Sequence, residues 1–226
     1  MKSRSTRIAM VAAGGILLAG LLTSCSEAIN QNGIAPARVL RAPILSVPSS
    51  GQLHGAILRS SDVQSGWTFV QHELPLSVKG TGCSTGLGSL PSPAGRAMVE
   101  YRDQQDPVPV LAEGLASYRQ SQAASVYSDL VRALDDCRDG QLQVGVTAVG
   151  AQVSHAGPLS LGGVANQSYF AVLTGPAAGV HVGVDLFRDG RVLGWVAYSA
   201  PTASTSATLN QYAERAVGKL RPLAGP

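Results

Sequence analysis

The chain has 226 residues, of which 45% are hydrophobic and 14% are charged, a composition typical of a globular protein rather than a disordered one. Its formal net charge of +3 comes from three basic residues, Lys2, Arg4 and Arg7, because the 14 other basic residues balance the 14 acidic ones. Beyond these three residues there is no basic excess, so we expect no nucleic-acid partner and no electrostatic attraction to anionic lipid.

An apolar run over residues 8–22 follows the basic start of the chain. Its length of about 15 residues matches the hydrophobic region of a signal peptide and falls short of the roughly 20 residues that span a bilayer. The run ends in LTSC, residues 22–25, which matches a bacterial lipobox. In a lipobox the small residues fit the signal peptidase and the cysteine thiol receives a diacylglyceryl group. We therefore expect a signal peptide over residues 1–24 and lipidation of Cys25, with acyl chains such as palmitate.

Two alternatives to this lipid anchor are weaker. An ordinary secretory signal, with Cys25 incidental, is disfavoured because no better A-x-A-like cleavage site lies nearby. A retained transmembrane helix is disfavoured because the polar residues Ser24, Ser26 and Glu27 end the apolar run. Each buried acyl methylene contributes about 0.8 kcal/mol, so two or three chains would hold the protein at the extracytoplasmic face of the cell membrane.

Residues 26–52 are rich in Pro, Ser, Gly and Asn, which is typical of a linker. We expect residues 25–52 to form the lipidated cysteine and a flexible tether, and residues 53–226 to form one domain. As a flexible coil the tether would span roughly 30 Å. Alternatively, its apolar stretch over residues 39–47 docks on the domain as an edge segment.

Two cysteines lie beyond Cys25, namely Cys83 and Cys137. In an exported protein such an even pair predicts a structural disulfide. Closing a loop of about 55 residues would stabilise the fold by roughly 4 kcal/mol in the chain-entropy model. A reactive thiol and a metal-binding pair are the alternatives, but neither cysteine lies in a C-x-x-C motif or within a few residues of a histidine.

The first half of the domain alternates short strands and loops. The predicted elements are a helical turn leading to a strand with Trp67 and Phe69, a loop over residues 74–95, a strand over 96–102, and a turn over 103–109. Residues 110–119 fit either a strand or a helix, and Gly114 favours the strand.

The clearest helix covers residues 121–137, where apolar side chains recur at three- and four-residue steps. Cys137 lies on this apolar stripe, so the disulfide would join the end of the helix to the loop around Cys83. A second amphipathic helix is predicted over residues 209–220.

Between the two helices, apolar and other residues alternate in the manner of strands. The alternating segments are residues 142–148, 169–173, 180–186 and 191–200. Asp189-Gly190 is a hairpin signal, and the short connections leave no room for crossover helices. The sequence therefore predicts an α+β fold: one twisted antiparallel β-sheet with two main helices packed on one face, and one disulfide.

The sequence gives little support for an enzyme. Its glycine-rich stretch KGTGCSTGLG lacks the Lys placement of a phosphate-binding loop. No two of the four histidines have metal-ligand spacing. We expect no catalytic residues, no metal, no cofactor and no enzymatic activity.

One candidate binding face combines His181, Asp185, Arg188 and Trp195. His181 and Asp185 alternate with the valines of their strand and are predicted to point away from them. Trp195 would join them if its strand exposes that phase, which would give an aromatic groove on an open face of the sheet. The alternatives are a solvated strand face for His181 and a core position for Trp195.

The chain resembles actinobacterial cell-envelope lipoproteins and the extracellular sensor domain of mycobacterial receptor Ser/Thr kinases. The resemblance rests on the lipobox and on LRSSDVQSGW, a Cys in a Gly-rich loop, MVEYR, ALDDC and LNQYAERAVGKL, within residues 53–221. It implies an antiparallel sheet with helices around a cleft, stapled by disulfides, and a ligand-binding or sensing role. The kinase sensor domains carry two disulfides, whereas this chain has cysteines for one beyond Cys25. The family provides no catalytic residues.

Three functions remain open from the sequence. The favoured one is a lipid-anchored domain that binds a small molecule, a lipid or a cell-wall fragment. The second is an interaction or scaffold lipoprotein that docks on a membrane protein partner without a small-molecule ligand. The third, an enzyme, has the least support.

Overall fold

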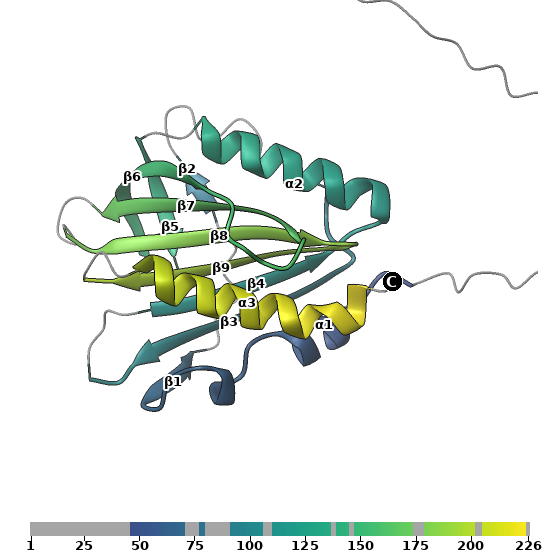
Figure 1. Ribbon diagram of the computed structural model, residues 1–226, viewed down its shortest axis with the longest axis horizontal. Helices are drawn as coiled ribbons and strands as arrows, with labels where there is room; N and C mark the ends of the chain where they lie inside the picture. Colours follow the sequence, from purple (N-terminus) through teal and green to yellow (C-terminus); the bar gives the residue numbers. More distant parts are fainter. Residues whose placement is uncertain are drawn as a thin grey trace, which may run out of the picture. The chain divides into compact units, whose positions relative to one another are not determined.

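The computed structural model describes residues 46–70, 77–79, 91–105, 110–136, 139–144, 147–173, 179–201 and 205–224 (Figure 1). The predicted signal peptide, the lipidation site Cys25 and the predicted disulfide between Cys83 and Cys137 lie outside the described residues.

The described residues form a nine-stranded sheet in which every neighbouring pair is antiparallel, as the α+β prediction requires. Its strand order is β1-β3-β4-β9-β8-β7-β6-β5-β2. The strands are β1 (Trp67–Val70), β2 (Ser77–Lys79), β3 (Gly95–Asp103), β4 (Val110–Ser117), β5 (Asp139–Val144), β6 (Thr147–Gly157), β7 (Ala165–Leu173), β8 (His181–Asp189) and β9 (Val192–Ala200).

Three α-helices pack on this sheet: α1 (Ser50–Ala56), α2 (Gln120–Asp135) and α3 (Thr205–Ala224). A short 3₁₀ helix, η1 (Ser60–Asp62), lies between α1 and β1. The two main helices match the predicted amphipathic segments, and residues 110–117 adopt the strand that Gly114 favours.

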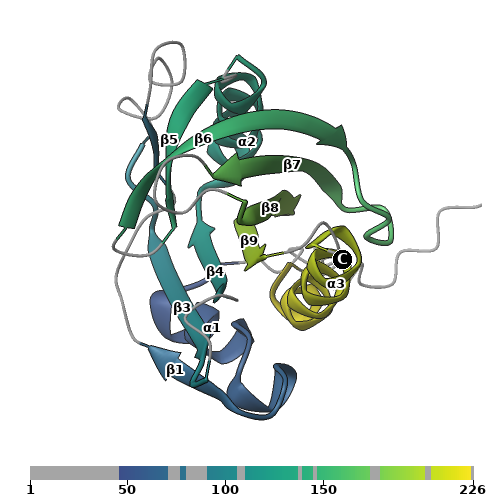
Figure 2. The same cartoon turned by 90° about the vertical axis from the view of Figure 1, so that its left-hand side faces the viewer.

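The prediction that both main helices share one face of the sheet is wrong, because α2 and α3 lie on opposite faces (Figure 2). On the α3 face, α1 and α3 cover a core that includes Phe187 and Val196. On the α2 face, Val126 of α2 packs in a second core with Val184 and Leu186. The sheet is therefore the middle layer of the domain rather than one of two layers.

The central strands can serve two cores because residues in both phases of their side-chain alternation are buried. Large side chains on each face lie over glycines of the neighbouring strand. A Cβ added at Gly114 would lie 2.7 Å from Cζ2 of Trp195, its partner across β4 and β9. On the opposite face, the ring of Phe187 occupies the space beside Gly194.

Two segments differ from the predicted strand pattern. The alternation over residues 142–148 was expected to be one strand, but it belongs to β5 and β6, which pair at Val144 and Thr147. Ser77–Lys79 forms β2 within the predicted loop and pairs with β5. Alternation alone does not separate the two strands, because apolar residues recur at the same two-residue spacing from β5 into β6.

The folded unit also begins earlier than residue 53. Ser49 caps α1 in a capping box with Gln52, and the Ser117 hydroxyl donates a 2.6 Å hydrogen bond to the Pro48 carbonyl. Pro48 is itself buried. The last residues of the predicted tether are therefore part of the domain.

Candidate functional site

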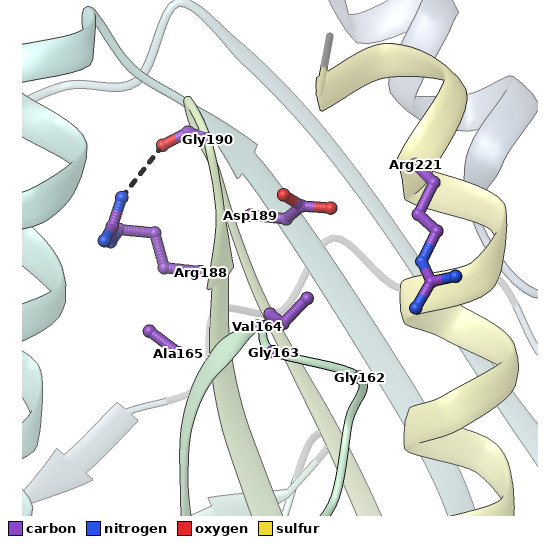
Figure 3. A pocket seen from close by; sticks show the side chains of 8 residues that line it. All are labelled: Gly162, Gly163, Val164, Ala165, Arg188, Asp189, Gly190 and Arg221. Carbon is purple, nitrogen blue, oxygen red and sulfur yellow. Dashed lines mark hydrogen bonds between the residues drawn. The ribbon is translucent and has the colours of Figure 1, made fainter. Parts of the chain in front are cut away.

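A cavity of about 500 Å³ lies between the β8–β9 hairpin, the loop before β7 and the last turn of α3 (Figure 3). We call it the hairpin slot. Its lining residues are Gly162, Gly163, Val164, Ala165, Arg188, Asp189, Gly190 and Arg221. The volume is within the ~300–1,000 Å³ of typical small-molecule sites.

The turn at Gly162 and Gly163 brings the backbone close to the guanidinium of Arg221. Both glycines have positive φ, +64° and +86°, a conformation that other residues rarely adopt. A Cβ at Gly162 would lie 2.5 Å from Nη2 of Arg221, so a larger residue there would require the guanidinium to move. The turn and the Arg221 side chain thus line the slot together.

The opposite wall is the end of β8. Asp189 pairs with Val192 across a two-residue hairpin in which Gly190 has a φ of +54°. The Asp189 side chain points toward Arg221 across the slot, whereas Arg188 points to the other side of the strand (Figure 3). Arg188 Nη1 donates a 3.3 Å hydrogen bond to the carbonyl of Gly190, which braces the hairpin.

The four residues of the predicted binding face do not share one face. His181 and Asp185 lie on the α3 face, in phase with Phe187, whereas Arg188 and Trp195 lie on the α2 face. Trp195 pairs with Leu186 and packs against the α2 core. Of the four, only Arg188 lines the hairpin slot.

Asp185 is a fully buried carboxyl beneath α3 rather than a surface ligand. Its Oδ1 accepts a 2.7 Å hydrogen bond from the Ser168 hydroxyl, and its Oδ2 has no partner among the described residues. Burial raises the pKa of Asp185 to about 7, and the hydrogen bond from Ser168 only partly opposes that shift.

Glu113 of β4 is a second fully buried carboxyl on the same face. Its Oε2 accepts a 2.7 Å hydrogen bond from the Leu58 amide, and the Tyr101 hydroxyl donates to the Leu58 carbonyl at 3.1 Å. Burial raises the pKa of Glu113 to about 8, against the smaller lowering effects of the Leu58 amide and Lys219. The two side chains thus hold both backbone groups of Leu58 against the sheet.

Asp62, at the end of η1, ties the same segment to α3. Its carboxylate pairs with the Lys219 ammonium, and Arg215 Nη1 donates a 2.5 Å hydrogen bond to its backbone carbonyl. Burial tends to raise the pKa of Asp62, but the hydrogen bonds from Lys219 and the Arg59 amide outweigh it and leave the pKa lowered. The segment between α1 and β1 is therefore fastened both to the sheet and to α3.

The hairpin slot escaped the sequence analysis for identifiable reasons. In the sequence, Asp189 and Gly190 indicate only a turn, and Arg221 lies one residue beyond the predicted closing helix. The Gly162-Gly163 pair ahead of a strand is a visible signal for an unusual turn. Its approach to Arg221, far along the chain, depends on the tertiary fold.

Among the described residues, no group of three or more His, Cys, Asp or Glu side chains is placed to hold a metal ion. The described helices include none with the length and hydrophobicity to cross a membrane. The slot contains charged and backbone polar groups in an open setting.

The fold defines the class of this domain more clearly than its sequence does. No protein-family model and no curated protein matches the chain. The structure is similar to the crystal structure of the extracellular domain of PknH from Mycobacterium tuberculosis, with a TM-score of 0.57 and 11% identity over 79% of this chain and 98% of that one. It also matches the solution structure of cyanobacterial PsbP (CyanoP) from Synechocystis sp. PCC 6803, with a TM-score of 0.37 and 12% identity over 71% and 87% of the two chains. The first similarity confirms the expected fold likeness to a mycobacterial kinase extracellular domain.

Proposed function

We propose that this protein is a lipoprotein anchored to the extracytoplasmic face of the cell membrane, whose α+β domain binds a small ligand in a sensor-like role. The observation that carries the proposal is the fold likeness to nearly the whole extracellular domain of PknH. The lipobox ending at Cys25 supports the anchor, and the hairpin slot offers a site of suitable volume for a small molecule.

Replacing the proposed lipid acceptor tests the anchor. In a host with bacterial lipoprotein processing, Cys25→Ser should reduce labelling by an alkyne-bearing palmitate to background and move the protein out of the membrane fraction, because no thiol remains to be acylated. Ser26→Ala, a matched change one residue away, should keep both the label and the membrane location. Labelling that persists in Cys25→Ser would contradict the proposal.

Native mass spectrometry tests ligand binding. The domain over residues 43–226, exported from an actinobacterial host, should carry an adduct that is absent from the denatured spectrum of the same sample. The mass of the adduct would define the ligand class. A clean unliganded mass would contradict tight ligand retention and favour the alternative of a lipoprotein that binds a protein partner instead.

A further inference from the structure

The two walls of the hairpin slot carry opposite charges that do not neutralise each other. The Asp189 carboxylate lies on the side of β8 that faces α3, and the Arg221 guanidinium extends along α3 toward Gly162 (Figure 3). Neither forms an ion pair within 4.0 Å with any other residue in the described part of the chain. Each charge is therefore available to a ligand in the space between the walls.

Each wall has a distinct chemical preference. At Arg221, a planar guanidinium lies against the backbone of Gly162, a setting that suits a carboxylate or a phosphate. At Asp189, a carboxylate at the end of a rigid hairpin suits an ammonium group. A ligand with only one of these charges would leave the other wall without a partner.

We propose that the hairpin slot binds a small zwitterionic molecule, with an anionic group held by Arg221 and an ammonium group held by Asp189. This inference rests on the proposed ligand-binding function and adds the ligand class and the two residues that select it. Because the two charged side chains lie on different elements of the fold, the separation of the ligand's two charges should be the main determinant of specificity.

Binding of a simple zwitterion through these two charged contacts alone is weak and sensitive to salt. Arg221 is exposed and Asp189 is only partly buried, so water and ions screen both contacts. A dissociation constant of roughly 1 mM is expected for a simple zwitterion at low ionic strength. Burial of the ligand's carbon chain beside Val164 would tighten it.

The experiment titrates the full chain, purified from membranes in a non-ionic detergent and labelled with ¹⁵N-glycine, with ω-amino carboxylates from glycine to 6-aminohexanoate. The amide shifts of Gly162, Gly163 and Gly190 report on the slot. One chain length should bind about tenfold more tightly than its methyl ester and its N-acetyl derivative, each of which lacks one charge. O-Phosphoethanolamine, run in parallel, distinguishes a preference for phosphate from one for carboxylate.

Variants assign the two contacts. Asp189→Asn should weaken binding of the best zwitterion to the level of its N-acetyl derivative, and Arg221→Gln should weaken it to the level of the methyl ester. Two exposed residues near the ends of α2 give matched controls, Asp136→Asn and Arg119→Gln, which should leave the dissociation constant unchanged within about twofold.

Two results would overturn the zwitterion site. One is an affinity that does not depend on charge separation, and the other is full binding by Asp189→Asn and Arg221→Gln. Failure of the site and failure of the proposed function are distinguishable, because an adduct that survives in the Asp189→Asn/Arg221→Gln double variant would place the ligand elsewhere on a domain that still binds one.

Discussion

Glu113→Gln is expected to stabilise the domain at pH 8 and to remove much of its loss of stability between pH 4.5 and 8. The folded state keeps the Glu113 proton up to about pH 8, whereas the unfolded chain releases it near pH 4.5. Between these values the unfolded chain binds fewer protons, so the free energy of unfolding falls as pH rises and is highest below pH 4.5. Glutamine is neutral throughout and keeps an acceptor for the Leu58 amide.

The expected gain at pH 8 is about 1–3 kcal/mol. The difference between the unfolded pKa of 4.5 and the folded pKa of about 8 corresponds to about 5 kcal/mol of unfolding free energy, at 1.4 kcal/mol per pH unit. This value is an upper limit, because the fold relaxes around a charged Glu113 and reduces the cost of the charge. At pH 4.5 the two proteins should agree within about 1 kcal/mol, since protonated Glu and Gln are nearly isosteric. Urea unfolding at several pH values gives both curves.

Glu100→Gln is the matched control, because Glu100 is also buried but pairs with Arg102 at 2.5 Å. Losing that partner should lower stability at pH 8 rather than raise it. Asp185→Asn should flatten the pH profile further, since burial raises the pKa of Asp185 to about 7 as well. A Glu113→Gln protein that is less stable than the parent at pH 8 would show that Glu113 is charged in the fold.

The helices and the β8–β9 hairpin could be predicted from the sequence because each depends on a short, local sequence pattern. The amphipathic stripes gave α2 and α3, and Asp189-Gly190 gave the β8–β9 hairpin. The burial of Glu113 also has a visible signal, since it is the single charge within the otherwise apolar stretch VLAEGLA. A charge in that setting is either exposed on one face or buried with a raised pKa, and the fold decides which.

The side of the sheet on which Trp195 lies could also have been deduced from the sequence. A two-residue hairpin loop at either Asp189-Gly190 or Gly190-Arg191 pairs Trp195 with an even-numbered residue of β8. Val182, Val184 and Leu186 are even-numbered, so Trp195 shares their face and not that of His181. The hairpin slot could not be predicted in this way. The turn at Gly162 and the last turn of α3 are far apart in the sequence and come together only when both pack on the sheet.

The prediction that both main helices cover one face of the sheet was wrong because of one assumption. It assumed that a sheet with alternating residues has one apolar face and one solvent-exposed face. Leu186 and Phe187 are consecutive, both fully buried, and belong to the two different cores. A sheet covered on one side would bury one of them and expose the other. Their separate substitution therefore tests the three-layer arrangement directly.

Leu186→Ala and Phe187→Ala should each destabilise the domain strongly, by about 2–5 and 3–5 kcal/mol respectively, because each leaves a cavity in its own core. Losses of this size approach the whole stability of a typical domain. The milder changes Leu186→Val and Phe187→Leu should keep the protein folded and measurable in urea, with smaller losses in both.

Hydrogen exchange separates the two cores. Leu186→Val should raise exchange mainly in α2, and Phe187→Leu mainly in α3, because each side chain supports the helix on its own face. The exposed position Gln211 provides a control, since Gln211→Ala should change neither stability nor exchange appreciably. A near-zero effect of either β8 substitution would mean that its face is open to solvent, and the sheet would then have one helical layer instead of two.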